Sequence, residues 1–400
     1  SIDVVSSSQF QHGVDFFDLI ICDEAHRTTG ATLNDEDESN FVKIHRDSNI
    51  KGRKRLYMTA TPKIYGEKAK KKEEEGLITL ASMNDESLYG STIFQRGFSW
   101  AVENNLLSDY KVVVLMMDEE IVSNTLQKSF TEGSELALDD VTKIIGCYKA
   151  LAKIGLNESK INDQENIMPM KRALAFCQNI KLSKVFSKEF KNVVDDYLTS
   201  NPSKQNIANE GLNVQTSHID GSFNAEERNA ELTWLQEETP EDVCRVISNA
   251  RCLSEGVDVP SLDAIIFAHP RRSQIDVVQS VGRVMRKAKG KELGYVILPI
   301  AVAPGVTAKK ALDDNERYEI IWQILNALRA HDERFDSTIN RISLGEDVSN
   351  RLEIVDGTSL AELEATTAVV DDVKSKRKKD PASSGNSGQS DESGKKNEEE

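Results

Sequence analysis

The chain has 400 residues, more than one hydrophobic core usually covers, so its length predicts two packed lobes with appendages. Its 66 acidic residues outnumber its 50 basic residues and give a net charge of −16, which argues against a protein that coats nucleic acid through bulk electrostatics. The five cysteines show no secretory spacing, and no segment approaches the roughly 20 apolar residues that cross a bilayer, so we expect no membrane contact and a cytoplasmic protein.

The first hundred residues predict strands that alternate with helices. An almost continuous apolar run at 16–22 is typical of a strand in a parallel sheet that is buried on both faces. A second strand is expected at 56–58, closed by the Thr-Ala-Thr segment that follows it. The Lys- and Glu-rich segment 63–76 is expected to be a solvated helix or loop. Because the chain begins at Ser1 with residues typical of the middle of a domain, we expect a fragment.

A second series of strands and helices begins after residue 107. Short apolar runs predict strands at 112–115, 172–176, 218–219, 243–247, 264–267 and 295–298. Helices are expected at 140–154, from 177 through 190, and from 224 to 238, where Asn224 is a suitable N-cap. Strands that alternate with helices indicate a parallel α/β sheet, and two such series predict two lobes.

The last hundred residues predict a helical extension and then a tail. Apolar residues at helical spacing predict a helix that packs on the second lobe; they are Tyr318, Ile321, Leu325 and Leu328. From 371 onward the composition is almost free of apolar residues, which predicts disorder. We therefore divide the chain into a first lobe at 1–106, a second lobe at 107–304, a helical extension at 305–370 and a disordered tail at 371–400.

The segment Asp23-Glu24-Ala25-His26 follows the first predicted strand. Ligands of open parallel sheets bind beyond the carboxyl ends of the strands, so two acids at this place face a site. A site that hydrolyses a nucleotide needs one carboxylate to hold Mg²⁺ and another to orient or deprotonate the attacking water. Asp23 suits the first role and Glu24 the second, although a tetrapeptide of this kind also occurs by chance.

The segment Thr59-Ala60-Thr61 follows the second predicted strand of the same lobe. Hydroxyl side chains at a strand end can hydrogen-bond the acids and relay their state to a neighbouring lobe. The alternative interpretation is an ordinary polar turn before Pro62.

The segment 276–287 forms an amphipathic helix on a helical wheel. One face is apolar and consists of Val277, Val278, Val281, Val284 and Met285. The opposite face carries Gln279, Gly282, Arg283 and Arg286, with the glycine leaving room for close approach. Such a helix can present guanidinium groups to a triphosphate on a facing lobe. The alternative is a solvated basic face.

The segment 254–260 lies between two predicted strands. Gly256 permits an unusual backbone angle, and Asp258 can accept a hydrogen bond from a ribose hydroxyl or from an arginine. A simple loop made of turn residues explains the same segment equally well.

Taken in chain order, these segments resemble the motor of superfamily 2 DEAH-box helicases and translocases. DEAH is similar to motif II and TAT to motif III, while 173–179 is similar to motif IV, 254–260 to motif V and QSVGRVMR at 279–286 to motif VI. The resemblance implies an α/β fold with two RecA-like lobes, of which the first is incomplete, and ATP bound between them.

The resemblance also implies a role for each matching residue. It assigns Mg²⁺ to Asp23 and water activation to Glu24. Coupling of hydrolysis to movement is assigned to His26, Thr59 and Thr61. The motif VI residues Arg283 and Arg286 are implied as arginine fingers, with Gln279 contacting the site from the same helix. Gly256 and Asp258 are implied to lie near the nucleotide.

A closer resemblance is to the motors of restriction enzymes, in particular the single-chain type ISP proteins. The stretches DEAHRTTG, DESNFVKIH and KRLYMTATPKIYG carry this likeness, and Ser280 stands where many RNA helicases have arginine. It implies double-stranded DNA as the partner, with nuclease and methyltransferase or specificity domains outside this chain. The sequence contains no G-x-x-x-x-G-K-[ST] loop, so motif I is expected upstream of Ser1 and the fragment alone is expected to be inactive. An RNA helicase and a catalytically dead binding fragment remain alternatives.

Overall fold

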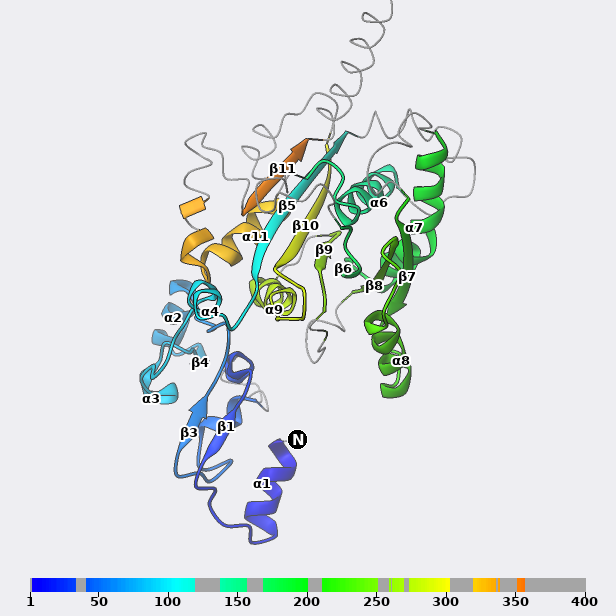
Figure 1. Ribbon diagram of the computed structural model, residues 1–400. Coiled ribbons are helices and arrows are strands. Elements are labelled where there is room, and N and C mark those ends of the chain that lie inside the picture. Colours follow the sequence, from blue (N-terminus) through cyan, green and yellow to red (C-terminus); the bar gives the residue numbers. More distant parts are fainter. Residues whose placement is uncertain are drawn as a thin grey trace, which may run out of the picture. The chain divides into compact units, whose positions relative to one another are not determined.

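The computed structural model describes residues 2–33, 41–118, 137–156, 168–200, 211–250, 259, 261–269, 273–302, 319–335, 337–338 and 351–356 (Figure 1). The chain divides into a compact unit at 1–356 and a second unit at 357–400, which lies outside the described residues. The predicted disordered tail therefore also lies outside them. Within the described residues, no helix is long and apolar enough to cross a membrane.

The first hundred residues form short elements around two small sheets. The helical elements are α1 (Ile2–Gln11), η1 (Ala25–Thr28), η2 (Val42–His45), α2 (Glu67–Glu74), α3 (Glu86–Tyr89) and α4 (Phe98–Glu103). The strands are β1 (Ile20–Cys22), β2 (Gly30–Leu33), β3 (Arg55–Tyr57) and β4 (Ile78–Ala81). β1 pairs with β3 in parallel, and β2 pairs with β4 in antiparallel. α2 has no buried residue, so the segment predicted as a solvated helix or loop contains a solvated helix at Glu67–Glu74.

The first predicted strand is shorter and less buried than expected. β1 covers only Ile20–Cys22, and Phe17 contributes an isolated bridge to Gly52. Ile21 is 58% exposed, so the expectation of burial on both faces was wrong. The physical reason is that β1 pairs with a single strand in the described part of the chain, which leaves one edge and part of one face without a covering element.

The second lobe is built on a seven-stranded sheet in the described part of the chain (Figure 1). Its strands are β5 (Asp109–Asp118), β6 (Arg172–Phe176), β7 (Asn213–Ile219), β8 (Val243–Asn249), β9 (Ala264–Phe267), β10 (Leu293–Val302) and β11 (Leu352–Asp356). They lie in the order β11-β5-β10-β9-β6-β8-β7, and each neighbouring pair is parallel. The predicted parallel α/β sheet is therefore confirmed.

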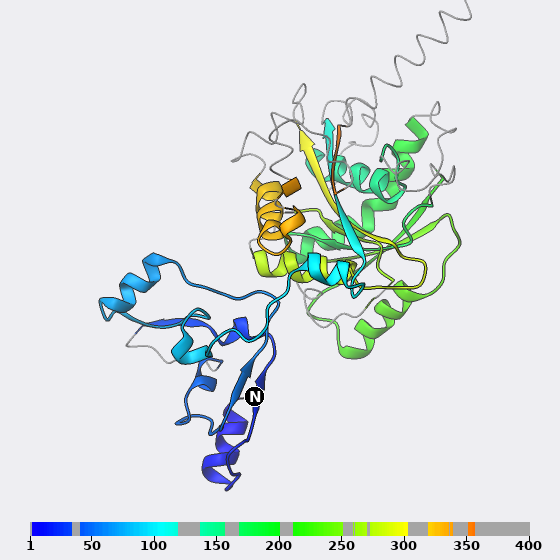
Figure 2. The same cartoon turned by 60° about the vertical axis from the view of Figure 1, so that its left-hand side comes forward.

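Five helices with described bounds accompany this sheet: α6 (Leu138–Leu151), α7 (Ile180–Ser200), α8 (Ala225–Gln236), α9 (Gln274–Val284) and α11 (Glu319–Arg329). α6 packs against β5, β10 and α7, while α9 packs against α11. In Figure 2, α6 lies beside α7, and α9 lies beside α11. Asn224 caps α8 as predicted, because its side chain accepts from the Glu227 N–H and the Glu227 side chain accepts from the Asn224 N–H.

The region predicted as a helical extension also contributes a strand. α11 is a helix as expected, but β11 joins the sheet edge beside β5. Lys111 of β5 and Glu353 of β11 form an ion pair of 2.6 Å, with side chains that are 0% and 8% exposed. The prediction missed β11 because a buried charge interrupts its short apolar run, and the partner of that charge lies far away in the sequence.

Candidate active site at the DEAH turn

The DEAH segment begins where β1 ends and is joined to the segment that follows β3. The Met58 N–H donates to the Cys22 carbonyl, and the Ala25 N–H donates to the Met58 carbonyl, each at 2.9 Å. These bonds extend the β1–β3 pairing by one step beyond the two strands. They place DEAH and Thr-Ala-Thr side by side at the carboxyl ends of parallel strands, where ligands of such sheets bind.

The two carboxylates of this turn lie in different environments. Asp23 is exposed, and its Oδ1 accepts from the Glu24 N–H at 2.9 Å, while its Oδ2 accepts no hydrogen bond from the described residues. Glu24 is partly buried and has φ 49° and ψ 46°, in the left-handed region. That conformation costs a non-glycine residue about 1–2 kcal/mol, so neighbouring contacts must hold it.

His26 connects the carboxylate of Glu24 to the Thr-Ala-Thr segment. Its side chain is buried, and Nδ1 lies 3.3 Å from Glu24 Oε2 and 3.1 Å from Thr59 Oγ1. Thr59 Oγ1 also accepts from the Thr61 N–H at 3.1 Å. Thr61 Oγ1 is buried and has no hydrogen-bond partner among the described residues. The contact between the two segments thus runs through the imidazole, whereas the sequence suggested direct hydrogen bonds from the threonines to the acids.

Helix α9 has the amphipathic character that its sequence predicts. Its N-cap is Ser273, whose side chain accepts from the Asp276 N–H. The residues predicted to form its apolar face are all at most 2% exposed: Val277, Val278, Val281, Val284 and Met285. Burial of this face fixes the rotation of the helix and therefore the direction of the opposite, polar face.

Gln279 joins the polar face of α9 to the DEAH turn. Its Nε2 donates to Glu24 Oε2 at 2.9 Å. Its Oε1 is buried and has no hydrogen-bond partner among the described residues. The structure therefore brings Glu24, His26, Thr59 and Gln279 together, and Glu24 Oε2 is the atom that both the imidazole and the amide approach.

The other predicted residues of the segment 279–286 lie partly on α9 and partly in the turn that follows it. Gly282 and Arg283 lie on α9 itself and are partly buried. Arg286 was predicted on the helix, but α9 ends at Val284, and the Arg286 N–H donates to the Arg283 carbonyl in a tighter turn. A Cβ added at Gly282 would have the ring of Phe98 as its nearest neighbour, at 3.9 Å, so α4 lies against this position.

Gly256 and Asp258, which the resemblance implies near the nucleotide, lie outside the described residues. The sequence analysis did not identify the side chains that support the DEAH turn, namely His45, Tyr57 and Tyr89. No local pattern signals them, because they come from three separate elements and meet only in the folded lobe.

The arrangement suits hydrolysis assisted by a hard cation. Asp23 offers an exposed carboxylate with one oxygen that accepts no hydrogen bond from the described part of the chain, which fits a Mg²⁺ ion held directly or through water. Glu24 offers a carboxylate oxygen whose direction is set by an amide donor and an imidazole, as a group that orients water requires. Two acids with such different surroundings can divide these two roles.

Two family models match parts of the chain that contain these residues. Residues 3–64 match the family described as "Type III restriction enzyme, res subunit", and residues 158–288 match "Helicase conserved C-terminal domain". Among curated proteins, the chain is similar to "Probable helicase A859L" of African swine fever virus (strain Badajoz 1971 Vero-adapted). The two are 26% identical over 322 residues, which are 80% of this chain and 30% of the viral protein.

Two solved structures are also similar. The "ATP-dependent Type ISP restriction-modification enzyme LlaBIII bound to DNA" has 41% sequence identity and a TM-score of 0.72, with coverage of 89% of this chain and 22% of that one. A nuclease-deletion mutant of the Type ISP restriction-modification enzyme LlaGI in complex with a DNA substrate mimic has 32% identity and a TM-score of 0.51, with coverage of 93% and 21%. This chain thus spans less than a third of the length of these relatives.

Proposed function

Because this chain is a superfamily 2 helicase-type motor segment related to the motors of restriction enzymes, we propose that it is part of an ATP-hydrolysing motor that moves on double-stranded DNA. The observation that carries the proposal is the hydrogen bond from Gln279 of α9 to Glu24 of the DEAH turn. It joins an acid suited to water activation with the helix that bears Arg283 and is followed by the turn that bears Arg286.

The acids of the DEAH turn would divide the chemistry of hydrolysis. Asp23 would hold Mg²⁺, which supplies positive charge to the phosphate oxygens when it is bound. Glu24 would orient the attacking water and accept its proton. Gln279 and His26 would fix the direction of the Glu24 carboxylate, because each approaches the same oxygen.

The remaining motif residues would act on charge and on coupling. Arg283 and Arg286 would stabilise the charge that develops on the transferred phosphoryl group, as arginine fingers do. His26, Thr59 and Thr61 would transmit the state of the site, and the contact between His26 and Thr59 supports this role. Gly256, Asp258 and Gly282 would lie near the nucleotide, as the family resemblance implies.

Double-stranded DNA is the proposed track of the motor. The two similar type ISP structures hold DNA or a DNA substrate mimic, and this chain covers about a fifth of each. Nuclease, methyltransferase and specificity functions would therefore belong to parts of the complete protein outside these 400 residues. Nucleic-acid contact would come from local basic or backbone groups, since the chain as a whole is acidic.

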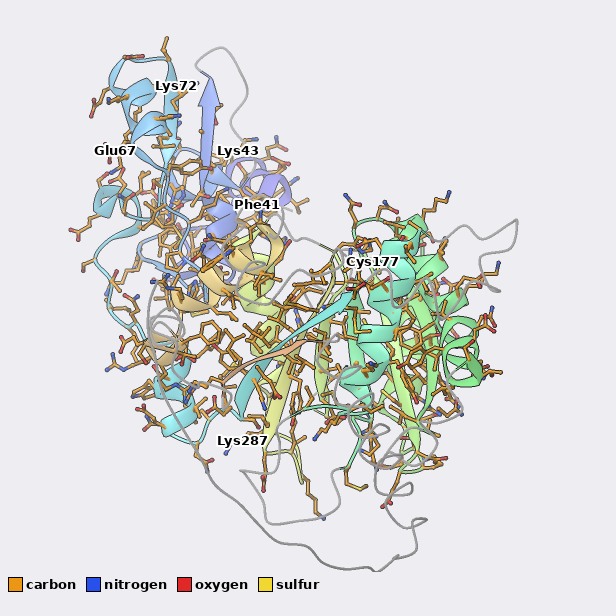
Figure 3. All side chains as sticks on the ribbon, turned by 90° about the horizontal axis from the view of Figure 1, so that it is seen from above. Phe41, Lys43, Glu67, Lys72, Cys177 and Lys287 are labelled. Atoms are coloured by element: carbon orange, nitrogen blue, oxygen red, sulfur yellow. The ribbon has the colours of Figure 1, made fainter. Side chains whose placement is uncertain are left out.

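The test is the rate of ATP hydrolysis by the complete protein with and without duplex DNA. We expect duplex DNA to stimulate the rate, and Glu24→Gln to lower the stimulated rate by roughly 10²–10⁴-fold, the usual contribution of a general base. Glu67→Gln is the matched control, because Glu67 lies on the solvated helix α2, where Figure 3 labels it with Lys72.

Two outcomes would contradict the proposal. Hydrolysis that duplex DNA does not stimulate, or that survives Glu24→Gln, would remove the motor function. Stronger stimulation by single-stranded RNA than by duplex DNA at the same salt concentration would favour an RNA helicase. Separately, Mg²⁺-dependent ATP binding by the 400-residue chain alone would contradict the expectation that this segment lacks the phosphate-binding loop.

A further inference from the structure

Three aromatic side chains from other elements pack together beside the turn that follows Glu24; two of them contact it directly, and the third contacts those two. They are His45 at the end of η2, Tyr57 at the end of β3 and Tyr89 at the end of α3; Figure 3 labels Lys43 of η2. Their rings pack against one another, with centroids 5.3 Å apart for His45 and Tyr57, 4.7 Å for His45 and Tyr89, and 4.8 Å for the two tyrosines. We call these three side chains the aromatic clamp.

The contacts of His45 fix the position of its proton. His45 Nε2 lies 2.9 Å from the Thr28 carbonyl oxygen, which can only accept, so Nε2 carries the hydrogen. In the neutral ring Nδ1 is then an acceptor, and it lies 2.8 Å from the Tyr57 hydroxyl, which donates to it. Burial raises the pKa of Tyr57, so this hydroxyl keeps its proton. The neutral Nε2–H form of His45 therefore satisfies both contacts at once.

Tyr89 contacts the same turn through a side chain. The Thr28 hydroxyl donates to the Ala25 carbonyl at 2.7 Å, so its single hydrogen is already used. The Tyr89 hydroxyl, 3.1 Å away, must then be the donor to Thr28 Oγ1. Both contacts converge on Thr28, the last residue of η1, through its carbonyl and its hydroxyl.

The clamp acts on the segment whose geometry decides where the Glu24 carboxylate points. η1 begins directly after Glu24, whose left-handed backbone conformation is unfavourable for a residue with a side chain. If the end of η1 is released, the turn can relax, and Glu24 Oε2 then leaves the positions that His26 and Gln279 share. None of the three clamp residues touches the carboxylate in the contacts described above, so their effect on it is indirect.

We propose that His45, supported by Tyr57 and Tyr89, is a positioning residue for Glu24: its Nε2–H holds the end of η1 and thereby keeps the water-orienting carboxylate in place. The expected effect on ATP hydrolysis rests on the proposed function. The expected effect of the clamp on the structure of the turn does not. We therefore expect the hydrogen bond from His45 to Thr28 to contribute more to the position of the Glu24 carboxylate than the aromatic ring of His45 does.

Two substitutions separate the hydrogen bond from the ring. His45→Phe keeps an aromatic ring beside Tyr57 and Tyr89 and removes both hydrogen bonds. His45→Gln removes the ring but retains an N–H donor that can reach the Thr28 carbonyl. In the complete protein we expect His45→Phe to lower kcat for DNA-stimulated ATP hydrolysis by about tenfold. KM should change little, because the substitution displaces the carboxylate that orients the water and leaves substrate binding intact. His45→Gln should recover most of that loss, and the exposed His12→Gln should behave as wild type.

A second measurement does not depend on catalysis. Hydrogen exchange of the complete protein should become faster for a peptide covering residues 23–29 in His45→Phe, with peptides of β6 and β9 unchanged. A His45→Phe protein with normal kcat and normal exchange would overturn the inference. If wild-type protein hydrolyses no ATP but the exchange change appears, the proposed function fails while the clamp stands. A general rise in exchange across both lobes would show a loss of folding and would also overturn the specific role.

Discussion

The candidate site has two halves, the polar face of α9 and the DEAH turn, and different physical causes position the two groups that meet at Glu24 Oε2. α9 presents Gln279 because an apolar face of regular helical period is buried, and that burial alone sets the direction of the polar face. The DEAH turn presents Glu24 in an unfavourable backbone conformation that contacts from η2, β3 and α3 support. A local pattern is therefore enough for one half, whereas the other depends on tertiary contacts.

The largest expected effect tests the rigid framework beneath α9. Phe267 of β9 is fully buried, stacks on Phe176 at 5.5 Å and belongs to the same core as the apolar face of α9. Phe267→Ala should lower the free energy of unfolding of the second lobe by about 4 kcal/mol, since it leaves a large cavity. Urea unfolding followed through the fluorescence of Trp234 and Trp322, which pack against this core, measures the change.

The control for that prediction lies in the first lobe. Phe16 is 50% exposed, so Phe16→Ala should change the stability by less than about 1 kcal/mol. Equal losses for the two substitutions would break the comparison, because they would mean that the first-lobe half has a framework as deeply packed as the second.

The sequence predicted most of the framework and little of what holds the turn. β6 and β9 were predicted because each is a run of apolar residues. The buried face of α9 was predicted because its apolar residues recur at helical spacing. The pairing of β2 with β4 was not predicted, because their sequences, Gly-Ala-Thr-Leu and Ile-Thr-Leu-Ala, do not form continuous apolar runs. The left-handed conformation of Glu24 and the aromatic clamp could not be predicted, since they result from packing between distant residues.

The buried ion pair between Lys111 and Glu353 tests the edge strand that the sequence did not reveal. Lys111→Met should lower the stability by about 3 kcal/mol, because it leaves the Glu353 carboxylate buried without its partner. The double variant Lys111→Met, Glu353→Met should recover most of that loss. The pair between Lys191 and Asp195 has the same 2.6 Å separation but is exposed, so Lys191→Met should change the stability by less than about 0.5 kcal/mol. A double variant as unstable as the single one would contradict the assignment of β11 to the sheet.

A smaller effect is expected at the cap of α8, where local sequence again determines the structure. Asn224→Ala removes the acceptor for the Glu227 N–H and one half of the capping box, which should cost about 1 kcal/mol. Asn192→Ala is the control, because Asn192 lies on the exposed surface of α7, where alanine is the better helix former. Equal stability of Asn224→Ala and wild type in urea unfolding would show that the cap contributes nothing to the lobe.

The last prediction concerns the turn after α9 and appears only as a dependence on pH. Lys291 Nζ donates to the carbonyls of Leu262 and Arg286, and burial lowers the pKa of Lys291 to about 8, partly opposed by the nearby Asp263. Well below pH 8 the amine is charged in both the folded and the unfolded state, so its contribution to stability is constant. Between pH 8 and its usual value of 10.5 the folded protein loses the proton while the unfolded chain keeps it.

The free energy of unfolding of the wild type should therefore rise relative to Lys291→Met as the pH increases from about 8 toward 10. Comparing the two proteins at each pH cancels the titration of other groups that they share. Urea unfolding of both at pH 7.5 and pH 9.5 measures the difference. A difference that stays constant or falls with pH would mean that the Lys291 amine is better solvated than its contacts indicate. The hydrogen bond from Lys291 to the Arg286 carbonyl would then stabilise the turn less than the buried apolar face stabilises α9.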